Sequence, residues 1–212
     1  MSENLYKTME ELNKKQHWET VYETKSPDQV SWTQEVPKTS LGLIHSFGMD
    51  KTARIIDIGG GDSKLVDFLL DAGYKDITVL DISEKAIDRA KERLGDRAEK
   101  VNWIVSDVTE FAPDTSYDIW HDRAAFHFLT SPGQVAKYSE TVRKAVTGFV
   151  IIGTFSTNGP TKCSGLEIKQ YSEETLTSEF DNDFSKMQCI TEDHITPFNT
   201  TQNFLFCSFK RK

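Results

Sequence analysis

Short apolar runs alternate with stretches in which apolar residues recur every three or four positions, and this alternation fills most of the chain. Runs rich in β-branched residues predict strands at 54–58, 77–80, 101–106, 117–122 and 148–155. Helical spacing between these runs predicts helices over 65–72, over 84–94 with Ser83 as N-cap, and over 132–145 with a capping box that starts at Ser131. A helix over 172–180 and two strands, at 187–194 and 202–210, follow. Strands that alternate with helices predict an α/β domain.

The stretch before the first predicted strand carries two predicted helices. Trp18, Val21 and Tyr22 share one helical face, and Pro37 opens a second run with helical spacing. We expect residues 1–53 to form a helical cap over a core of residues 54–212, within a single domain 1–212.

Residues 54–83 read as a complete strand–turn–helix–strand unit. Gly59, Gly60 and Gly61 follow the first strand, and Asp81 ends the second. Glycines allow a tight turn and the close approach of a ligand, and the start of the following helix favours an anion. A carboxylate at the end of the second strand suits ribose hydroxyls. The unit predicts a nucleoside ligand; the alternative is that the glycines form only a turn and that Asp62 or Ser63 is only an N-cap.

The residue at position 64 bears on which nucleoside is bound. A dinucleotide fingerprint that starts at Gly59 needs a small residue there, whereas the chain has Lys64. The segment 57–61, Asp-Ile-Gly-Gly-Gly, instead resembles the first motif, D-x-G-x-G, of class I (seven-β-strand) S-adenosylmethionine-dependent methyltransferases.

The resemblance spans roughly residues 37–210 and implies a fold. That fold is a Rossmann-like three-layer sandwich with a seven-stranded, mostly parallel sheet in the order 3-2-1-4-5-7-6, strand 7 being antiparallel.

The resemblance also implies S-adenosyl-L-methionine as cofactor and S-adenosyl-L-homocysteine as product. The residues it assigns to the cofactor are Asp57, Gly59, Gly60 and Gly61 at the methionine end, Asp81 on the ribose, Ile82 on the adenine face, Asp107 with Val108 on the adenine edge, and His121. On local grounds alone, Asp107 reads equally well as a strand-end residue that caps the next turn.

A narrower likeness follows the fourth strand. Residues 122–127, Asp-Arg-Ala-Ala-Phe-His, are similar to the D-K-G-T-F-D stretch of methyltransferase-like protein-lysine methyltransferases. The match is partial: Arg replaces Lys, Ala-Ala replaces Gly-Thr, and His replaces the final Asp. The likeness therefore implies a shared cofactor geometry and not a shared protein substrate.

Candidates for catalysis and acceptor binding gather near the carboxyl ends of the fourth and fifth strands. Asp122, His121 and His127 are the candidates to accept a proton from an amine acceptor. The alternative is that the histidines are packed residues or cofactor contacts. The predicted acceptor-binding residues are Trp32, Arg123, Phe126 and Lys162; the alternative for Trp32 is packing.

Composition limits the partners. The chain has 25 basic and 33 acidic residues, a net charge of −8, and no basic cluster larger than the tail 210–212. An acidic surface argues against nucleic acid as partner. No apolar run approaches the roughly 18 residues that a membrane span needs. A cytoplasmic protein is expected, and the sequence does not indicate an oligomeric state.

The three cysteines, Cys163, Cys189 and Cys207, have no paired spacing and no metal-ligand pattern. We expect all three to be reduced and none to bind metal. Cys163, beside Lys162, is the one thiol whose pKa a neighbouring cation would lower.

The sequence as a whole predicts methyl transfer from S-adenosylmethionine to a small molecule or a protein side chain. Two alternatives stay open: an NAD(P)-dependent oxidoreductase, and a non-catalytic module that binds the cofactor.

Overall fold

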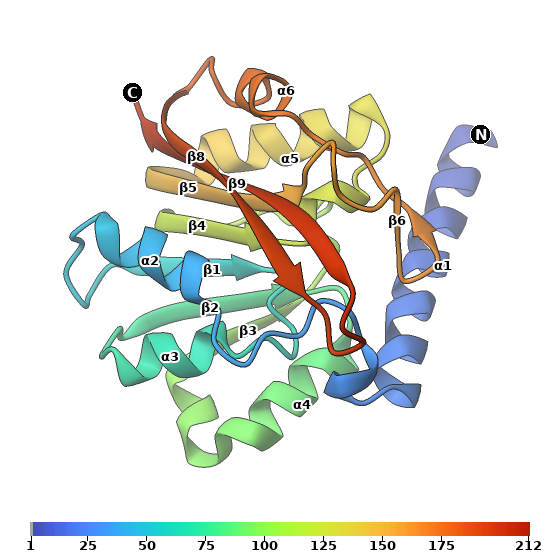
Figure 1. Ribbon diagram of the computed structural model, residues 1–212, viewed down its shortest axis with the longest axis horizontal. Coiled ribbons are helices and arrows are strands. Elements are labelled where there is room, and N and C mark those ends of the chain that lie inside the picture. Colours follow the sequence, from blue (N-terminus) through green and yellow to red (C-terminus); the bar gives the residue numbers. More distant parts are fainter. Residues whose placement is uncertain (1) are drawn as a thin grey trace.

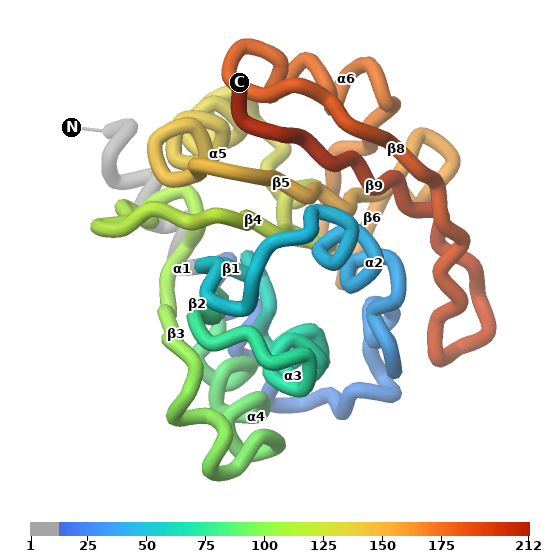
Figure 2. Tube along the Cα trace, turned by 90° about the vertical axis from the view of Figure 1, so that its left-hand side faces the viewer, coloured from blue at the N-terminus to red at the C-terminus, as the bar shows by residue number. Residues whose placement is uncertain are grey.

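The computed structural model describes residues 13–212 with their side chains, and the backbone of the first helix from Ser2 (Figures 1 and 2). Its centre is a seven-stranded sheet in the order β3-β2-β1-β4-β5-β9-β8. Strands β1 to β5 are parallel to one another, and β9 is antiparallel to both β5 and β8. The strands are β1 (Arg54–Ile58), β2 (Asp76–Asp81), β3 (Val101–Val105), β4 (Tyr117–Arg123), β5 (Val146–Phe155), β8 (Phe184–Ile195) and β9 (Thr201–Arg211).

The predicted fold is confirmed. A two-stranded hairpin of β6 (Lys162–Cys163) and β7 (Leu166–Glu167) lies outside the sheet, and without it the strand order equals the predicted order. Strands β1 to β5 begin and end within two residues of their predicted bounds. The largest departure is β8, which starts at Phe184 and not at the predicted residue 187. A register shift between Lys186 and Gln188 interrupts the alternation of side chains, so the sequence pattern shows only the part of the strand that follows it.

Helices cover both faces of the sheet, as the alternation of apolar side chains along the strands requires. Ile55 of β1 belongs to an apolar layer that includes residues of α2 (Lys38–Ser46), α3 (Leu65–Asp71) and α4 (Glu84–Leu94). Its neighbour Ile56 belongs to the layer on the opposite face, which includes residues of α5 (Pro132–Ala145) and α6 (Glu173–Ser178). The core therefore has two apolar layers with the sheet between them.

The first helix, α1 (Ser2–Thr24), crosses the carboxyl ends of the parallel strands (Figure 1). The one-turn 3₁₀ helix η1 (Pro27–Gln29) links α1 to residues 30–33, which we call the strap. Residues of β8 and β9 hold the strap: His194 Nε2 donates to Ser31 O (2.7 Å), and Gln202 Nε2 donates to Ser31 Oγ (3.2 Å). The N-terminal segment thus covers the edge of the sheet at which ligands of such folds bind.

The prediction that all cysteines are reduced is wrong for two of them. Cys189 and Cys207 are joined in a disulfide because they face each other on β8 and β9, with their Cα atoms 4.2 Å apart. Cys163 is free and buried, and burial raises the pKa of its thiol to about 11. The thiol pKa is therefore not lowered by Lys162, whose ammonium pairs with Glu167.

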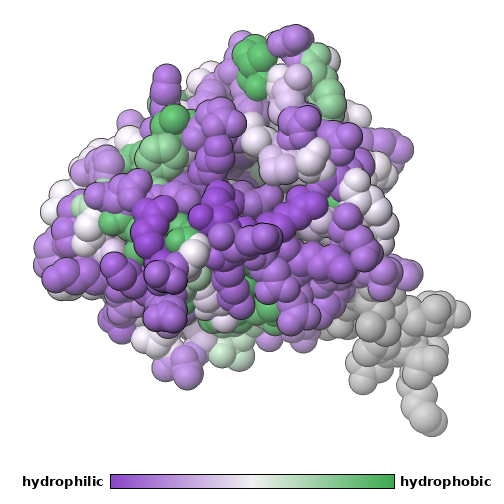
Figure 3. Space-filling model, turned by 90° about the horizontal axis from the view of Figure 1, so that it is seen from below, coloured by the Kyte–Doolittle hydropathy of each residue, from purple (hydrophilic) through white to green (hydrophobic). Residues whose placement is uncertain are grey.

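The surface in Figure 3 is mainly hydrophilic, with scattered hydrophobic side chains. None of the helices that the structure describes combines the length and apolar character that a membrane span requires. Within residues 13–212, no three His, Cys, Asp or Glu side chains are grouped closely enough to hold a metal ion.

Candidate functional site

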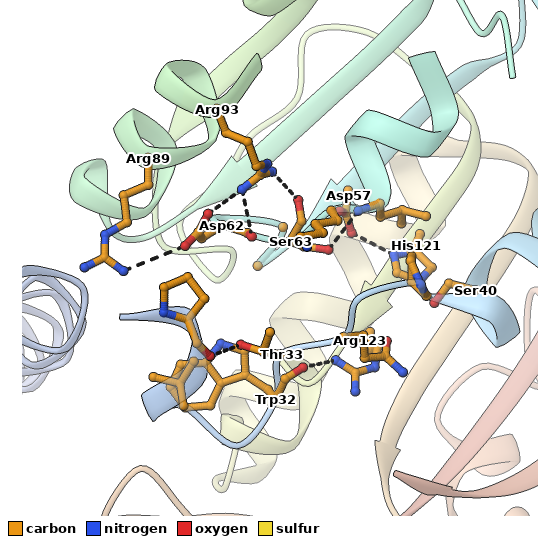
Figure 4. Close-up of a pocket in the computed structure, with 18 of the residues that line it drawn as sticks. Trp32, Thr33, Ser40, Asp57, Asp62, Ser63, Arg89, Arg93, His121 and Arg123 are labelled. Atoms are coloured by element: carbon orange, nitrogen blue, oxygen red, sulfur yellow. Dashed lines mark hydrogen bonds and ion pairs between the residues drawn. The ribbon is translucent and has the colours of Figure 1, made fainter. Parts of the chain in front are cut away.

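Two adjoining hollows lie where the parallel strands end. One, which we call the Asp57 hollow, has walls formed by Ser40, Asp57, Gly60, Ser63, Lys64 and His121, among others (Figure 4). The other, the Asp81 hollow, has walls formed by Asp81, Ile82, Asp107, Val108, Trp18 and Phe128, among others. Four residues line both hollows: Tyr22, Trp32, Gly59 and Arg123. The two hollows are therefore parts of one site, divided at Gly59.

The glycine turn between the hollows has no room for side chains. Gly59 and Gly61 have φ values of +63° and +27°, which favour glycine. A Cβ on Gly60 would lie 2.6 Å from Asp57 Oδ2, and one on Gly61 would lie 2.6 Å from Asp81 Oδ2. The turn thus brings backbone against the two carboxylates that the sequence assigns to the cofactor.

Asp57 is held by a buried chain of hydrogen bonds. Asp57 and His121 are register partners on β1 and β4. A carboxylate only accepts, so His121 Nδ1 donates to Asp57 Oδ1 (2.7 Å), and His121 Nε2 lies 2.8 Å from Ser40 Oγ. The Asp57 carboxylate is therefore fixed in the wall of its hollow.

Asp81 ends β2 and is 5% exposed. Burial raises the pKa of its carboxyl to about 7, and the nearby charges of Asp57 and Glu19 add to this, although Ser83 N donates to Asp81 Oδ1 (2.8 Å). Hydrogen bonds donated by a ligand would stabilise the charged form of this carboxyl group.

Asp107 lies in the wall of the Asp81 hollow beside Ile82 and Val108. Its Oδ1 accepts from Thr109 N and from Thr109 Oγ1, both at 2.8 Å. The residue therefore caps the turn that follows β3, and it also faces the hollow. Both readings of Asp107 from the sequence are compatible with this position.

Aromatic side chains cover the site. Trp18 of α1 packs edge-on against Trp32 of the strap and Phe128, with ring centroids 5.7 and 5.1 Å apart, and Tyr22 packs on Trp32 at 6.3 Å. Glu19, on the same helix, accepts hydrogen bonds from Ser83 Oγ and from the first two N–H groups of α4. Helix α1 is thus docked on the start of α4.

Arg93 fixes the segment that leaves the glycine turn. Its guanidinium donates to Asp62 O (3.1 Å) and Ser63 O (2.8 Å) and pairs with the carboxylate of Asp62 (Figure 4). It also pairs with the carboxylate of Asp67 (2.9 Å). Ser63 Oγ in turn accepts from Leu65 N (3.1 Å) at the start of α3. The N-cap residue of α3 is Lys64, so the alternative that Asp62 or Ser63 is the N-cap is wrong, and Ser63 lies in the wall of the Asp57 hollow.

Four predicted site residues lie outside both hollows, so the direct acceptor contact expected of them has no support in this geometry. Asp122 faces the α5 side of the sheet, where it accepts from Tyr138 OH (2.8 Å) and from Phe126 N (3.0 Å). His127 is fully buried and stacks on Phe155. Phe126 packs in the core, and Lys162 lies on the exposed β6–β7 hairpin.

The other predicted residues come together. Asp57, Gly59, Gly60, Asp81, Ile82, Asp107, Val108, His121, Trp32 and Arg123 line the two hollows, and Gly61 lies directly beneath Asp81. Four residues of the walls were not predicted from the sequence as site residues: Ser40, Trp18, Tyr22 and Phe128. The helical face of Trp18 and Tyr22 was a usable signal, whereas Ser40 follows no motif.

Comparison with known proteins agrees with this geometry. Residues 55–147 match the family model described as a methyltransferase domain. The fold and this central segment are similar to those of class I methyltransferases. The matched segment contains the glycine turn and the carboxyl ends of β1 to β4, which form one part of the walls of both hollows.

Its curated relatives are larger proteins. The eEF1A lysine and N-terminal methyltransferase of Bos taurus is 28% identical over 120 residues, which cover 56% of this chain and 17% of that protein. The malonyl-[acyl-carrier protein] O-methyltransferase of Anoxybacillus flavithermus is 34% identical over 103 residues, which cover 48% of this chain and 38% of that protein. The chain thus aligns with well under half the length of each of these relatives.

Among solved structures, the 1,6-didemethyltoxoflavin-N1-methyltransferase of Burkholderia thailandensis, with bound 1,6-didemethyltoxoflavin and S-adenosylhomocysteine, has the same fold. The TM-score is 0.71 at 16% identity, over 98% of this chain and 90% of that chain. The named relatives are methyltransferases, and none of them supports the NAD(P)-dependent alternative.

Proposed function

We propose that this protein transfers the methyl group of S-adenosylmethionine to an acceptor that is a small molecule or a protein side chain. The observation that carries the proposal is the joint site itself. A glycine turn without room for side chains lies between two buried carboxylates, Asp57 and Asp81, which line adjoining hollows.

The residues fit the cofactor. In this proposal Asp57, which is hydrogen-bonded to His121, binds the α-amino group of the methionine part, and Asp81 accepts from the ribose hydroxyls. Ile82 and Val108 offer apolar surface to the adenine, and Asp107 lies beside them as an acceptor for its amino group. When bound, the cofactor supplies an activated methyl group on a sulfonium.

The protein itself supplies proximity, alignment and exclusion of water. A displacement on a sulfonium needs no covalent residue of the enzyme, so holding donor and acceptor in line is the main task. Trp18, Tyr22 and Trp32 pack on one another over the site, and we propose that they shield it from water when the cofactor is bound. Both ring nitrogens of His121 are hydrogen-bonded, and Asp122 faces α5, so we propose that the rate comes from alignment rather than from a base among these residues.

The test combines binding and transfer. Calorimetry should show S-adenosylhomocysteine binding to the wild type and binding about 10- to 100-fold weaker to Asp81→Asn, the scale of one or two lost charge-assisted hydrogen bonds. NAD and NADP should not bind. A labelled methyl donor, incubated with the enzyme and a native lysate, should then show whether label enters the protein or the small-molecule fraction. Binding of NAD without S-adenosylhomocysteine would refute the proposal.

A further inference from the structure

The guanidinium of Arg123 has two buried nitrogen atoms without a hydrogen-bond partner. Arg123 ends β4, and its Nη1 donates to Trp32 O (2.9 Å). Its Nε and Nη2 are buried and make no hydrogen bond to any residue of 13–212. Buried charges in proteins are nearly always paired, because desolvating an unpaired charge is costly.

The charged groups around Arg123 act on it without a hydrogen bond to its Nε or Nη2. His127 and His194 lie near enough for the Arg123 charge to lower their pKa values, to about 3 for His127, although burial is the larger cause. Both rings are therefore uncharged at neutral pH. Of the two acids whose charge acts on Arg123, Asp57 is bonded to His121, and Glu192 accepts from Thr39 and Gln34. The adjacent Asp122 points to the opposite face of the sheet.

The free part of the guanidinium has a definite shape. Nε and Nη2 form one edge of the planar group, with two parallel N–H donors that match the two oxygens of a carboxylate or the paired oxygens of a phosphate. Nη1, on the other side, is held by the strap, and the ring of Phe204 lies 4.8 Å from the guanidinium carbon. The edge is thus pre-oriented, and Arg123 lines both hollows at the point where they join.

We propose that the methyl acceptor carries an anionic group, a carboxylate or a phosphate, and that the Nε–Nη2 edge of Arg123 binds it. This inference rests on the proposed methyl transfer. It names the acceptor class: an anion anchored at the junction of the hollows. The buried surroundings strengthen such a pair, since an ion pair gains from a low dielectric when its hydrogen bonds are complete.

The test separates the acceptor from the donor, because S-adenosylmethionine has a carboxylate of its own. S-adenosylhomocysteine carries that carboxylate and methylthioadenosine lacks it. If Arg123 serves the acceptor, Arg123→Met binds both nucleosides within about twofold of the wild type. If Arg123→Met weakens S-adenosylhomocysteine by about tenfold or more and leaves methylthioadenosine unchanged, Arg123 binds the donor, and the inference is refuted.

The anion itself is probed with malonate and inorganic phosphate, each titrated into the S-adenosylhomocysteine complex. The readout is the NMR signal of the Arg123 Nε–H group, assigned by its absence from Arg123→Met. Either anion should shift this signal in the wild type, and the affinity should fall about tenfold or more in Arg123→Met. Tighter binding of malonate would mark a carboxylate acceptor, and tighter binding of phosphate a phosphorylated one.

Arg89→Met is the matched control. Arg89 lines the Asp57 hollow too, but it already pairs with Asp62 (3.7 Å) and donates to Lys25 O (2.7 Å). Its loss should change anion affinity less than about twofold. Equal anion binding by wild type and Arg123→Met, or no binding to the wild-type complex, would refute the inference. Failure of the wild type to bind S-adenosylhomocysteine is a separate result, visible before any anion is added, and would remove the proposed function as well.

A purely structural role for Arg123 gives a different result. If its task is only to hold the strap through Trp32 O, Arg123→Met lowers the melting temperature of the ligand-free protein and weakens both nucleosides. If the edge serves an acceptor, removal of this buried charge leaves the melting temperature unchanged or raises it by about 2–4 °C.

Discussion

The carboxyl group of Asp81 gives the site a pH dependence. Its pKa is raised to about 7, chiefly by burial, so the group changes charge near neutral pH. Ribose hydroxyls donate more strongly to the carboxylate than to the protonated acid. Affinity for S-adenosylhomocysteine should therefore rise as the pH increases from 6 to 8, by about tenfold at most per unit. Calorimetry over this range should show the rise for the wild type and a flat profile for Asp81→Asn.

The same residue predicts an opposite trend in stability. A carboxyl whose folded-state pKa is raised contributes stability below the unfolded value near 4, and this contribution is lost as the pH rises through 7. As the pH increases from 5 to 8, the melting temperature of ligand-free Asp81→Asn should therefore rise relative to that of the wild type. A constant difference between the two proteins across this range would show that Asp81 is not shifted.

Gly60 offers a test of the crowded turn. A Cβ there would meet Asp57 Oδ2 at 2.6 Å and Val79 Cγ1 at 2.9 Å, so Gly60→Ala should displace the Asp57 carboxylate from His121. We expect a loss of about 1–3 kcal/mol of stability and weaker binding of S-adenosylhomocysteine. In the control, Gly42→Ala in α2, the Cβ meets nothing within 4 Å and should stabilise by about 0.5–1 kcal/mol. Denaturant unfolding of both variants would measure these changes in the free energy of unfolding.

Most residues of the site could be predicted from the sequence, but some predicted residues, such as Asp122, lie on the opposite face of the sheet. Asp57, Asp81 and Gly59 follow from the end of a strand and the start of a turn, both of which local periodicity shows. Asp122 and Arg123 are neighbours on β4, and their side chains point to opposite faces of the sheet. Which face carries the site depends on where α2 and the strap pack, and the pattern of a single strand does not contain that information.

At the scale of whole elements, Glu19 joins α1 to α4. Hydrogen bonds from Glu84 N, Lys85 N and Ser83 Oγ lower the pKa of Glu19 although burial acts in the opposite direction. Glu19→Ala should loosen α1, because three hydrogen bonds from the start of α4 to the two carboxylate oxygens are lost at once. Hydrogen exchange over Trp18–Thr24 should become about 5- to 30-fold faster.

The matched control for this prediction lies one turn further along α1. Glu23 makes one exposed ion pair with Lys85 (3.1 Å), so Glu23→Ala should change the exchange rate little. Equal effects of Glu19→Ala and Glu23→Ala would contradict the docking role of Glu19.

The β8–β9 hairpin supplies a prediction about the cysteines. Thiol titration of the unfolded, unreduced protein should find one free thiol, Cys163, rather than three. Reduction of the disulfide opens a loop with a sequence separation of 18 residues and should cost about 3 kcal/mol of stability. Cys189→Ala should be insensitive to reductant, and three titratable thiols in the untreated wild type would rule the bond out.

Elements with a strong period could be predicted, and those held by distant contacts could not. Helix α4 follows from its apolar stripe and from Ser83, whose Oγ accepts from Ala86 N. The disulfide escaped prediction because Cys189 and Cys207 become neighbours only through the register of two strands. The strap, likewise, has no period of its own and is placed by Arg123, His194 and Gln202.

For the whole molecule, the covered site implies a coupling between ligand and stability. A ligand at one hundred times its dissociation constant stabilises the folded state by about 2.7 kcal/mol. For a chain of 212 residues this should raise the melting temperature by about 5–10 °C with S-adenosylhomocysteine. NAD at the same concentration should leave it unchanged. An equal shift with NAD would restore the oxidoreductase alternative.

The position of β9 sets an order of assembly. β8 comes earlier in the chain, yet its only neighbour in the sheet is β9, which lies between it and β5. β8 therefore has no partner until β9 has been made, and the two pair most simply as a local hairpin through the turn at 196–200. Phe204, Phe206 and Phe209 of β9 complete the apolar layers on both faces of the sheet. When synthesis has reached only β8, both apolar layers still lack the side chains of β9. We therefore expect cooperative folding to begin only after β9 has been made.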